Sequence, residues 1–530
     1  MNRSGRQVSQ AWPRIAAWLL ALPLLLPVLW LASSFADARP ELWSHLSTHV
    51  LPQATRNTLW LLLWVALLSL LPGVGFAWLC ARYEWPGRRL FDWALVLPLA
   101  LPGYVVAFVY VGLTDFAGPL QTAWRALGLS PSGFPAMRSV PGAALVLALV
   151  LYPYLFLILR AAFLRQGSAA LDAARSLGLG PKRAFLRAVL PMVRPAWVAG
   201  LSLVLLETIA DFGAVSILGV DTLSTSIYKT WFGLYSLPVA AQLACGLIAV
   251  VALVLILERL GRGRGRHTSR QLLAPPRRPL RGWRAAAATL SAAAVVCAGF
   301  VVPVTQLLVW AWRARGNLPD VGEAAWATLV LAALAALLVL ALSLAFASLQ
   351  RAAQHQDRIV RSAGFVAGLG YAVPGTVLAV GAMWLLVAAE RLLPWLAQLA
   401  LSSSVLAVLL ALAARFFRVG HEATEAAFES LRPTMLESAR LLGATRWQRI
   451  RRVALPLLRP GLVAAALLVL VEVMKELPAT LMLRPFGWDT LAVKIYSYTS
   501  EGLWQQAAWP ALWLLLVGLL PVWWLVRQQR

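Results

Sequence analysis

The sequence predicts an all-α polytopic membrane protein with twelve transmembrane helices in two parallel six-helix repeats. The first observation is composition: 60% of the 530 residues are hydrophobic and 13% are charged, whereas charged residues make up roughly a quarter of a soluble protein. The second is length, because apolar stretches of about 18 to 25 residues recur along the whole chain and are long enough to cross the bilayer as helices. The third is internal duplication, since patches of the first half recur in the second. Signals this long and continuous exclude barrel strands.

Twelve apolar segments are predicted. Many of the 25 tryptophans stand near segment ends, where their rings would anchor helices at the membrane interface. The N-terminal segment has a basic lead and a long apolar core without a convincing small-residue cleavage site, so we expect a first membrane span rather than a cleaved signal peptide. The segments lie near 15–33, 57–80, 92–113, 142–160, 197–218 and 238–257, and then near 286–310, 325–348, 362–388, 400–416, 461–483 and 506–526.

The chain divides into two halves of six segments each. We expect a first half at 1–258, a basic cytoplasmic linker at 259–284 and a second half at 285–530. The linker alternates glycine with arginine and then becomes rich in proline, which favours an unstructured tether with its arginines against anionic lipid headgroups. An RNA-binding run is the alternative. Because each half begins and ends on the same side, the halves can be related by an axis along the membrane normal.

The net charge of +25 is unevenly distributed. Arginines cluster before the first segment, after the second and after the fourth, and the intervening loops are poor in them. This is the positive-inside pattern, and it predicts a multi-pass protein with both termini in the cytoplasm. No base-reading or stacking module accompanies the charge, so we expect no nucleic-acid partner.

A polar, arginine-rich loop follows the fourth segment and recurs after the tenth, 265 residues later. Each copy carries an acidic residue followed by small residues, then a glycine, and then a leucine–proline pair. A membrane-surface helix held by anionic lipid would explain a single copy. Two copies with the same internal spacing favour docking onto a protein. The residues of the two copies are Asp172, Ala173, Ala174, Gly178, Leu190 and Pro191, and then Glu437, Ala439, Gly443, Leu455 and Pro456.

Each loop is predicted to form two short helices that meet at a turn. Gly178 stands where a residue with positive φ would end the first helix, and Pro181 suits the first position of the second helix. In the other copy, Thr445 and Gln448 supply a capping box instead. The second helix is amphipathic, with Phe185 on its apolar face and basic residues around the rest. The leucine–proline pair and Pro195 are expected to end this helix and redirect the chain into the next span.

Two pairs of carboxylates lie inside predicted spans, where ionisable groups are costly and mark functional sites. Each pair is spaced by four residues, which places both groups on one helix face. A helix-interrupting residue follows each pair, and broken helices beside polar groups mark translocation sites in other transporters. Four carboxylates would suit a hard trivalent cation. Alternatively, the acids satisfy backbone groups or pair with Lys475 and hold helices together. These residues are Glu207, Asp211 and Gly213 in the first half, and Glu472, Glu476 and Pro478 in the second.

Other patches support the duplication. The Pro102-Gly103 pair in the third segment corresponds to Pro374-Gly375 in the ninth, and both pairs are predicted to kink their helices. The tripeptide at 57–59 corresponds to that at 327–329. The tripeptide at 221–223 recurs 268 residues later, so three residues are inserted in the second half after its helix-interrupting position.

We expect no catalytic residues and no stable metal site. His45 and His49 are four residues apart, but no further ligands recur at a spacing typical of metal sites, and a solvent-facing helical turn is the simpler explanation. The three cysteines form no CxxC motif and are expected to be small buried hydrophobes. No lysine stands in a phosphate-binding loop, so ATP would have to be hydrolysed by a partner.

The repeated loop resembles the EAA loop of binding-protein-dependent ABC importer permeases, and the fused two-half form is similar to the iron(III) transport system permeases. The most specific sequence motifs are ETIADFG at 207–213 and KELPAT at 475–480. The departures from the family pattern are mild: Asp172 replaces the usual glutamate, and Ser438 replaces the first alanine of the second copy. Ala188 and Val453 stand where isoleucine is common.

This resemblance implies the type I ABC importer fold, in the inner membrane of a bacterium. It implies that the loops at 161–195 and 419–460 are coupling helices seated on a homodimeric ABC ATPase, which uses ATP and Mg while this chain binds no cofactor. A periplasmic solute-binding protein would deliver ferric iron for transport by alternating access. Thiamine, sulfate, polyamine and phosphonate are alternative solutes. An ion-driven secondary transporter is the alternative of a different class, although it would not need two matched docking loops.

Overall fold

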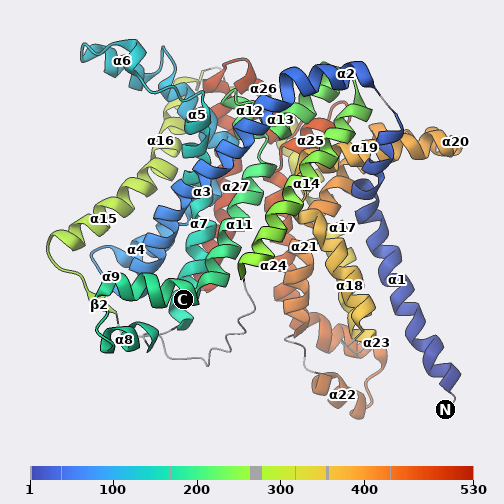
Figure 1. Ribbon diagram of the computed structural model, residues 1–530. Coiled ribbons are helices and arrows are strands. Elements are labelled where there is room, and N and C mark those ends of the chain that lie inside the picture. The colour runs from blue at the N-terminus through green and yellow to red at the C-terminus, as the bar shows by residue number, and fades with distance from the viewer. Residues whose placement is uncertain are drawn as a thin grey trace. The chain divides into compact units, whose positions relative to one another are not determined.

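The computed structural model in Figure 1 describes residues 3–37, 39–166, 169–262, 277–316, 318–353, 357–429, 431 and 433–528. Helices make up most of these residues, as the sequence predicts. The only strands in this part of the chain are β1 (Tyr83–Glu84) and β2 (Arg278–Pro279), which pair in parallel over two residues.

Long helices are separated by one or more short ones in most of both halves. In the first half the α-helices are α1 (Arg3–Trp30), α2 (Pro40–His45), α3 (Leu51–Arg82), α4 (Arg88–Ala94), α5 (Gly103–Thr114), α6 (Pro119–Ala126), α7 (Val140–Gln166), α8 (Ala169–Ser176), α9 (Pro181–Ala184), α10 (Leu190–Met192), α11 (Arg194–Ala210), α12 (Gly213–Ile217), α13 (Leu223–Tyr228) and α14 (Leu237–Arg262).

The second half repeats this order closely. Its α-helices are α15 (Trp283–Val296), α16 (Val302–Arg313), α17 (Gly322–Ala352), α18 (Arg358–Ala367), α19 (Gly375–Leu392), α20 (Pro394–Ala397), α21 (Val405–Glu429), α22 (Pro433–Leu441), α23 (Arg446–Arg449), α24 (Leu455–Lys475), α25 (Pro478–Leu483), α26 (Leu491–Ser500) and α27 (Trp504–Gln528).

The described residues pack into two compact units, and each unit combines segments from both halves of the sequence. The first unit contains 1–42, 227–245 and 320–494, and the second contains 43–226, 246–319 and 495–530. In the first unit, α1 packs on α18 and α19 of the second half. In the second unit, α27 packs on α16 and on the short turn η3 (Leu97–Ala100) of the first half. The predicted domain boundaries describe the duplication of the sequence and remain a prediction.

The same three-helix core lies at the centre of each unit. In the second unit, α3 packs along α7, and α11 contacts both. In the first unit, the matching helices α17, α21 and α24 contact one another in the same way. Each core is closed by aromatic rings: the centroids of Trp78 and Phe163 are 5.2 Å apart, and those of Phe346 and Phe417 are 5.1 Å apart.

Nine helices in the described residues are long and apolar enough to span a membrane, or up to eleven if two bent helix pairs are each one span. The structure therefore confirms a multi-pass membrane protein. The number of twelve spans and the parallel relation of the repeats remain predictions. The first bent pair lies at 182–210, where the axis turns by 75°, and the second at 394–429, where it turns by 70°.

The two proline–glycine pairs start new helices rather than kinking continuous ones. Pro102 and Pro374 are the N-terminal caps of α5 and α19, and both have extended backbones with ψ of 144°. The residues before them, Leu101 and Val373, are extended as well. Proline disfavours the helical conformation of the residue that precedes it, so each predicted kink is a complete break.

Part of the predicted tether has regular structure. Residues 259–262 continue α14, and 263–276 lie outside the described residues. Arg278 and Pro279 form β2, and the N–H of Leu280 donates to the carbonyl of Glu84 over 2.8 Å. Composition favoured an unstructured linker, but backbone pairing with β1 holds its C-terminal end against the first half.

Candidate functional site: two repeated loops and two broken helices

The first repeated loop has the predicted helix–turn–helix geometry. Gly178 follows α8 with φ of +82°, a conformation that glycine adopts without steric cost. Its N–H donates to the carbonyl of Arg175 over 2.9 Å, and the N–H of Leu179 donates to that of Ala174 over 3.1 Å. These bonds satisfy the last carbonyl groups of α8. Pro181 then opens α9, where its missing N–H would have no helical partner.

The second loop repeats this turn. Gly443 has φ of +81°, and the N–H of Ala444 donates to the carbonyl of Ala439 over 3.0 Å. The predicted capping box is present, because the N–H of Thr445 donates to Oε1 of Gln448 over 2.9 Å and the N–H of Gln448 donates to the Thr445 hydroxyl over 3.3 Å. The two loops therefore have one backbone design with different N-terminal caps on their second helices.

The predicted loop residues fall on matching elements of the two halves. Their functional role stays a prediction. Asp172, Ala173 and Ala174 lie on α8, and Leu190 and Pro191 begin α10. Glu437 and Ala439 lie on α22, and Leu455 and Pro456 begin α24.

Two leucines next to the cap glycines extend the candidate site beyond the predicted residues. Leu177 is 82% exposed and its counterpart Leu442 is 87% exposed, with Leu441 beside it at 88%. Each cap turn therefore presents a leucine side chain outward at the tip of a polar loop. Covering such a side chain is worth about 1.5 to 3 kcal/mol, and an apolar tip rimmed by polar residues is typical of a protein contact. The leucine–glycine pair that both copies contain is the sequence signal for these residues.

The two loops are seated differently on their helix cores. In the first, the Phe185 ring lies 4.8 Å from Trp78 of α3 and 6.3 Å from Phe163 of α7. In the second, Leu436 of α22 packs against buried leucines of α24, with Leu458 among them. Both arrangements attach the loop to the core helices by apolar contact, so a force on either loop reaches the membrane-spanning helices behind it.

The exits from the loops also differ. In the first half the chain turns at Val193, two residues after Pro191, and the axis bends by 75°. In the second half 447–475 is one continuous helix, and Pro456 and Pro460 are accommodated within it. The leucine–proline pair therefore does not itself end the second helix in either copy, but in the first half the chain turns just before Pro195, as predicted.

The first predicted pair of acids lies on α11 and at its end. Glu207 is half-buried, and Asp211 follows the last residue of the helix. Asp211 Oδ1 accepts the N–H of Ala214 over 2.8 Å and that of Val215 over 3.4 Å, so this carboxylate caps α12. Gly213 is the first residue of α12, and the helix is broken just before it, as the sequence predicts.

The second pair repeats this arrangement. Glu472 is half-buried on α24, and Glu476 follows the end of that helix. Both Glu476 oxygens accept the N–H of Ala479, over 3.0 and 3.1 Å, and Oε2 also accepts the N–H of Thr480 over 3.1 Å. Pro478 opens α25 after the break. Both acids next to the breaks therefore accept hydrogen bonds from backbone N–H groups, which was the alternative to solute binding. Contact of these acids with the solute remains a prediction.

A threonine fixes the segment that follows each break. Thr58 of α3 accepts the N–H of Leu223 over 3.1 Å, and Thr328 of α17 accepts the N–H of Leu491 over 2.8 Å. Both hydroxyls donate to the carbonyl one turn earlier in their own helices. The tripeptides that match in sequence thus make the same contact within each unit.

Arg415 lies beside the acid at the second break and was not predicted as a site residue from the sequence. It lies on α21, inside the predicted span at 400–416, and its guanidinium Nη1 is 3.9 Å from Oε1 of Glu476. The side chains are 15% and 2% exposed, respectively. A β-carbon on Gly375 would lie 2.5 Å from both of these atoms, so the start of α19 approaches the ion pair too closely for any larger residue. A charge within an apolar run was the available signal for Arg415.

The first break has no matching arginine. Position 150 of α7 corresponds to position 415 and carries Val150, which is 5% exposed. A β-carbon on Gly103 would lie 3.0 Å from Oδ2 of Asp211, so the glycine approaches the carboxylate here as well.

The histidines form no metal cluster. His45 ends α2 and His49 lies on the following turn, with ring centroids 5.3 Å apart. Among the residues that the structure describes, no three side chains of the metal-binding types are grouped closely enough to hold an ion.

Known proteins resemble this chain over different lengths. It is 24% identical over 531 residues to an Fe(3+)-transport system permease protein of Haemophilus influenzae, covering 96% of this chain and 97% of that protein. It is 34% identical over 165 residues to the sulfate transport system permease protein CysW of Escherichia coli, covering 30% of this chain and 55% of that protein. The molybdenum transport system permease protein ModB of Escherichia coli is 34% identical over 154 residues, 28% of this chain and 64% of its own length.

The family model for the binding-protein-dependent transport system inner membrane component matches twice, at 73–263 and at 352–529. Each matched region contains one repeated loop and one broken helix. The two matches together span more than half of the chain. This chain therefore belongs to the family of binding-protein-dependent transport system inner membrane components.

Proposed function

We propose that this chain is the transmembrane permease subunit of an ATP-driven ABC importer that carries ferric iron from the periplasm to the cytoplasm by alternating access. The observation that carries the proposal is the pair of loops, which have the same turn, glycine cap and outward-facing leucine. Two equal docking elements fit a partner with two equal binding grooves, such as a homodimeric ATPase. In this arrangement the chain is a multi-pass protein of the bacterial inner membrane, with both termini and both loops in the cytoplasm.

The partner supplies the chemical energy and this chain supplies the path. ATP and Mg belong to the ATPase subunits, and a periplasmic solute-binding protein delivers the solute to the opposite face. Closure of the ATPase dimer would move the loops, and the apolar contacts of Phe185 and Leu436 would transmit this movement to α3, α7 and α24. The breaks after α11 and α24 are points at which these helices can bend, because no continuous helical hydrogen bonding crosses them.

Ferric iron is favoured by the relative that matches over both halves, whose name states Fe(3+) transport. The carboxylates at the breaks fit a hard cation. An oxyanion is the second candidate solute, because Arg415 lies beside one break and shorter matches carry the names of sulfate and molybdenum permeases. Uptake by proteoliposomes of the assembled complex, with labelled ferric iron, sulfate and molybdate compared, tests this choice. Uptake of an oxyanion without uptake of iron would overturn the assignment to iron.

The docking role is tested separately at the two leucines. Leu177→Asp and Leu442→Asp place a charge where an apolar groove is expected, so ATPase co-purification should fall and solute-stimulated ATP hydrolysis should be lost. Leu127→Asp is the matched control, since Leu127 is 77% exposed on a different loop. Normal ATPase binding by both loop variants would contradict the proposed role of the loops.

A further inference from the structure

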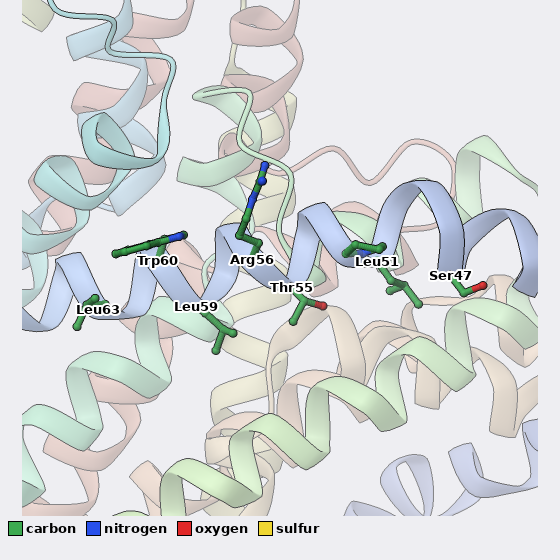
Figure 2. Close-up of a pocket in the computed structure, with 8 residues that line it drawn as sticks. Ser47, Leu51, Thr55, Arg56, Leu59, Trp60 and Leu63 are labelled. Carbon is green, nitrogen blue, oxygen red and sulfur yellow. The ribbon is translucent and has the colours of Figure 1, made fainter.

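A groove runs along the N-terminal part of α3 (Figure 2). Its volume is about 710 Å³. Its polar side chains, Ser47, Thr55 and Arg56, lie just before and in the first turns of α3, together with Leu51 and Pro52. Farther along the helix the lining consists of Leu59, Trp60 and Leu63.

The groove lies about one hydrocarbon thickness from the loop-bearing end of α3. Near that end, Trp78 contacts Phe185 of the first repeated loop. Arg56 precedes Trp78 by 22 residues, which is roughly 33 Å along a helix that rises 1.5 Å per residue, and the hydrocarbon core of a bilayer is about 30 Å thick. This axial length fits a placement of Arg56 at the headgroup level of the leaflet opposite the loops, with Leu59 to Leu63 among the first methylene groups of that leaflet.

The charge at the polar end is not matched by protein. Arg56 is exposed, and no ion pair of its guanidinium occurs among the described residues. The guanidinium group presents two parallel N–H donors that match a phosphate. The Thr55 hydroxyl lines the same groove. Below them, Leu59 and Leu63 are 59% and 46% exposed and offer an apolar bed for a hydrocarbon chain.

We propose that this groove binds one glycerophospholipid with an anionic headgroup, with the phosphate on Arg56 and one acyl chain along Leu59, Trp60 and Leu63. A lipid fits better than a soluble ligand, because the groove combines a single cationic end with an apolar length at bilayer depth. The second half lacks this arrangement, since Trp326 of α17 occupies the position that corresponds to Arg56. The site therefore distinguishes the two halves and does not depend on which solute is transported.

Native mass spectrometry of the full-length chain in mild detergent tests the proposal, with phosphatidylglycerol and phosphatidylcholine added in turn. The wild type should retain one phosphatidylglycerol in preference to phosphatidylcholine. Arg56→Ala should weaken phosphatidylglycerol binding about fivefold, the effect expected of one basic residue at an anionic surface, while Arg56→Lys should restore most of it. Arg138→Ala is the matched control, because Arg138 is exposed in another loop of the same unit.

Two further arms separate the possible sources of binding. Trp60→Ala should lower the retention of both lipids, because it removes part of the apolar bed, and millimolar inorganic phosphate should not displace the bound lipid. Equal retention of phosphatidylglycerol by the wild type and Arg56→Ala, both monodisperse in gel filtration, would overturn the proposal. Unchanged retention in Trp60→Ala, or displacement by free phosphate, would overturn the assignment of the acyl chain or of the lipid.

Discussion

The two helix breaks are built alike and differ in charge. At each break a carboxylate follows a long helix and accepts the backbone N–H groups of a short one, Asp211 in the first half and Glu476 in the second. At each break a glycine of a facing helix approaches that carboxylate. Only the second carboxylate has an arginine at the matched position of the core helix, where the first half has Val150. The duplicated architecture therefore tolerates two different electrostatic environments around one capping geometry.

The physical consequence is that the two breaks should respond differently to the same kind of substitution. A carboxylate that caps a helix is stabilised by N–H groups whether or not a cation is near. A buried carboxylate next to a buried guanidinium also depends on that cation, and removal of one partner leaves the other without its counter-charge. The second break should therefore be the more rigid and the more sensitive of the two.

Arg415→Met should have the largest effect. It leaves Glu476 buried beside an apolar side chain, and the expected loss in the free energy of unfolding is about 3 kcal/mol. Thermal unfolding of the purified chain in detergent measures it. Val150→Ile at the matched position is the control and should cost less, since it adds one methylene group to a buried apolar site and changes no charge.

The double variant Arg415→Met with Glu476→Gln should recover part of the loss, because it removes the uncompensated charge while keeping an acceptor for the N–H groups of α25. An unfolding temperature of Arg415→Met equal to that of the wild type would show that the ion pair is irrelevant to stability, and the two breaks would then be equivalent.

Gly375→Ala should destabilise the protein more than Gly103→Ala, so the second break is again the more sensitive one. The added β-carbon would meet Arg415 and Glu476 at 2.5 Å in the second half, whereas the nearest atom in the first half is an oxygen of Asp211 at 3.0 Å. Gly375→Ala should cost about 1 to 3 kcal/mol, and Gly103→Ala should cost less. Unfolding temperatures of the two variants measured side by side check the order. A larger cost at Gly103 would contradict the packing difference.

The breaks themselves were predictable from the sequence. Gly213 and Pro478 disfavour a continuous helix, and acids two residues earlier provide caps, so local residue chemistry was sufficient. The turns at Gly178 and Gly443 were predictable for the same reason, because a positive φ is a local property that glycine permits.

Contacts between distant segments were not predictable in the same way. Arg415 and Glu476 are far apart in the chain, and the single sequence holds no information on which helix faces meet. The packing of α1 on helices of the second half is of this kind too. The exposed leucines at 177 and 442 were missed for another reason: one apolar residue in a polar loop is common, and only its recurrence before the glycine in both copies sets it apart in the sequence.

Substitutions of the capping acids can distinguish a role in stability from a role in transport. Asp211→Asn keeps a good capping side chain and should be nearly neutral in stability, whereas Asp211→Ala should cost about 1 kcal/mol. If Asp211 also lines the path of the solute, Asp211→Asn in the assembled complex should lower uptake while the unfolding temperature stays unchanged. Wild-type uptake rates in both Asp211→Asn and Glu476→Gln, with normal assembly, would remove these acids from the path.

The smallest expected effect is a pH dependence at a helix cap of the second half that has no counterpart carboxylate in the first. Asp357 caps α18 by accepting the N–H of Ile359 over 2.9 Å and also accepts Nε of Arg14 over 2.7 Å. The matching residue before α4 is Gly87, which has no carboxylate. The hydrogen bond from Arg14 holds the pKa of Asp357 below its ordinary value.

Because the folded state lowers this pKa, the ion pair stabilises the protein above the ordinary aspartate pKa of about 4 and its contribution is lost as the pH falls through the folded value. The Arg14 side chain is 41% exposed, so solvent screening limits the contribution to roughly 0.2 to 1 kcal/mol. Asp357→Asn keeps the cap and removes the charge. Thermal unfolding at a series of pH values should therefore show the wild type slightly more stable than this variant at neutral pH, with the difference closing as the pH falls through the lowered pKa of Asp357. A difference that persists unchanged at low pH would mean that packing around α1 and α18, and not the charge of Asp357, distinguishes this corner of the second half from its counterpart in the first.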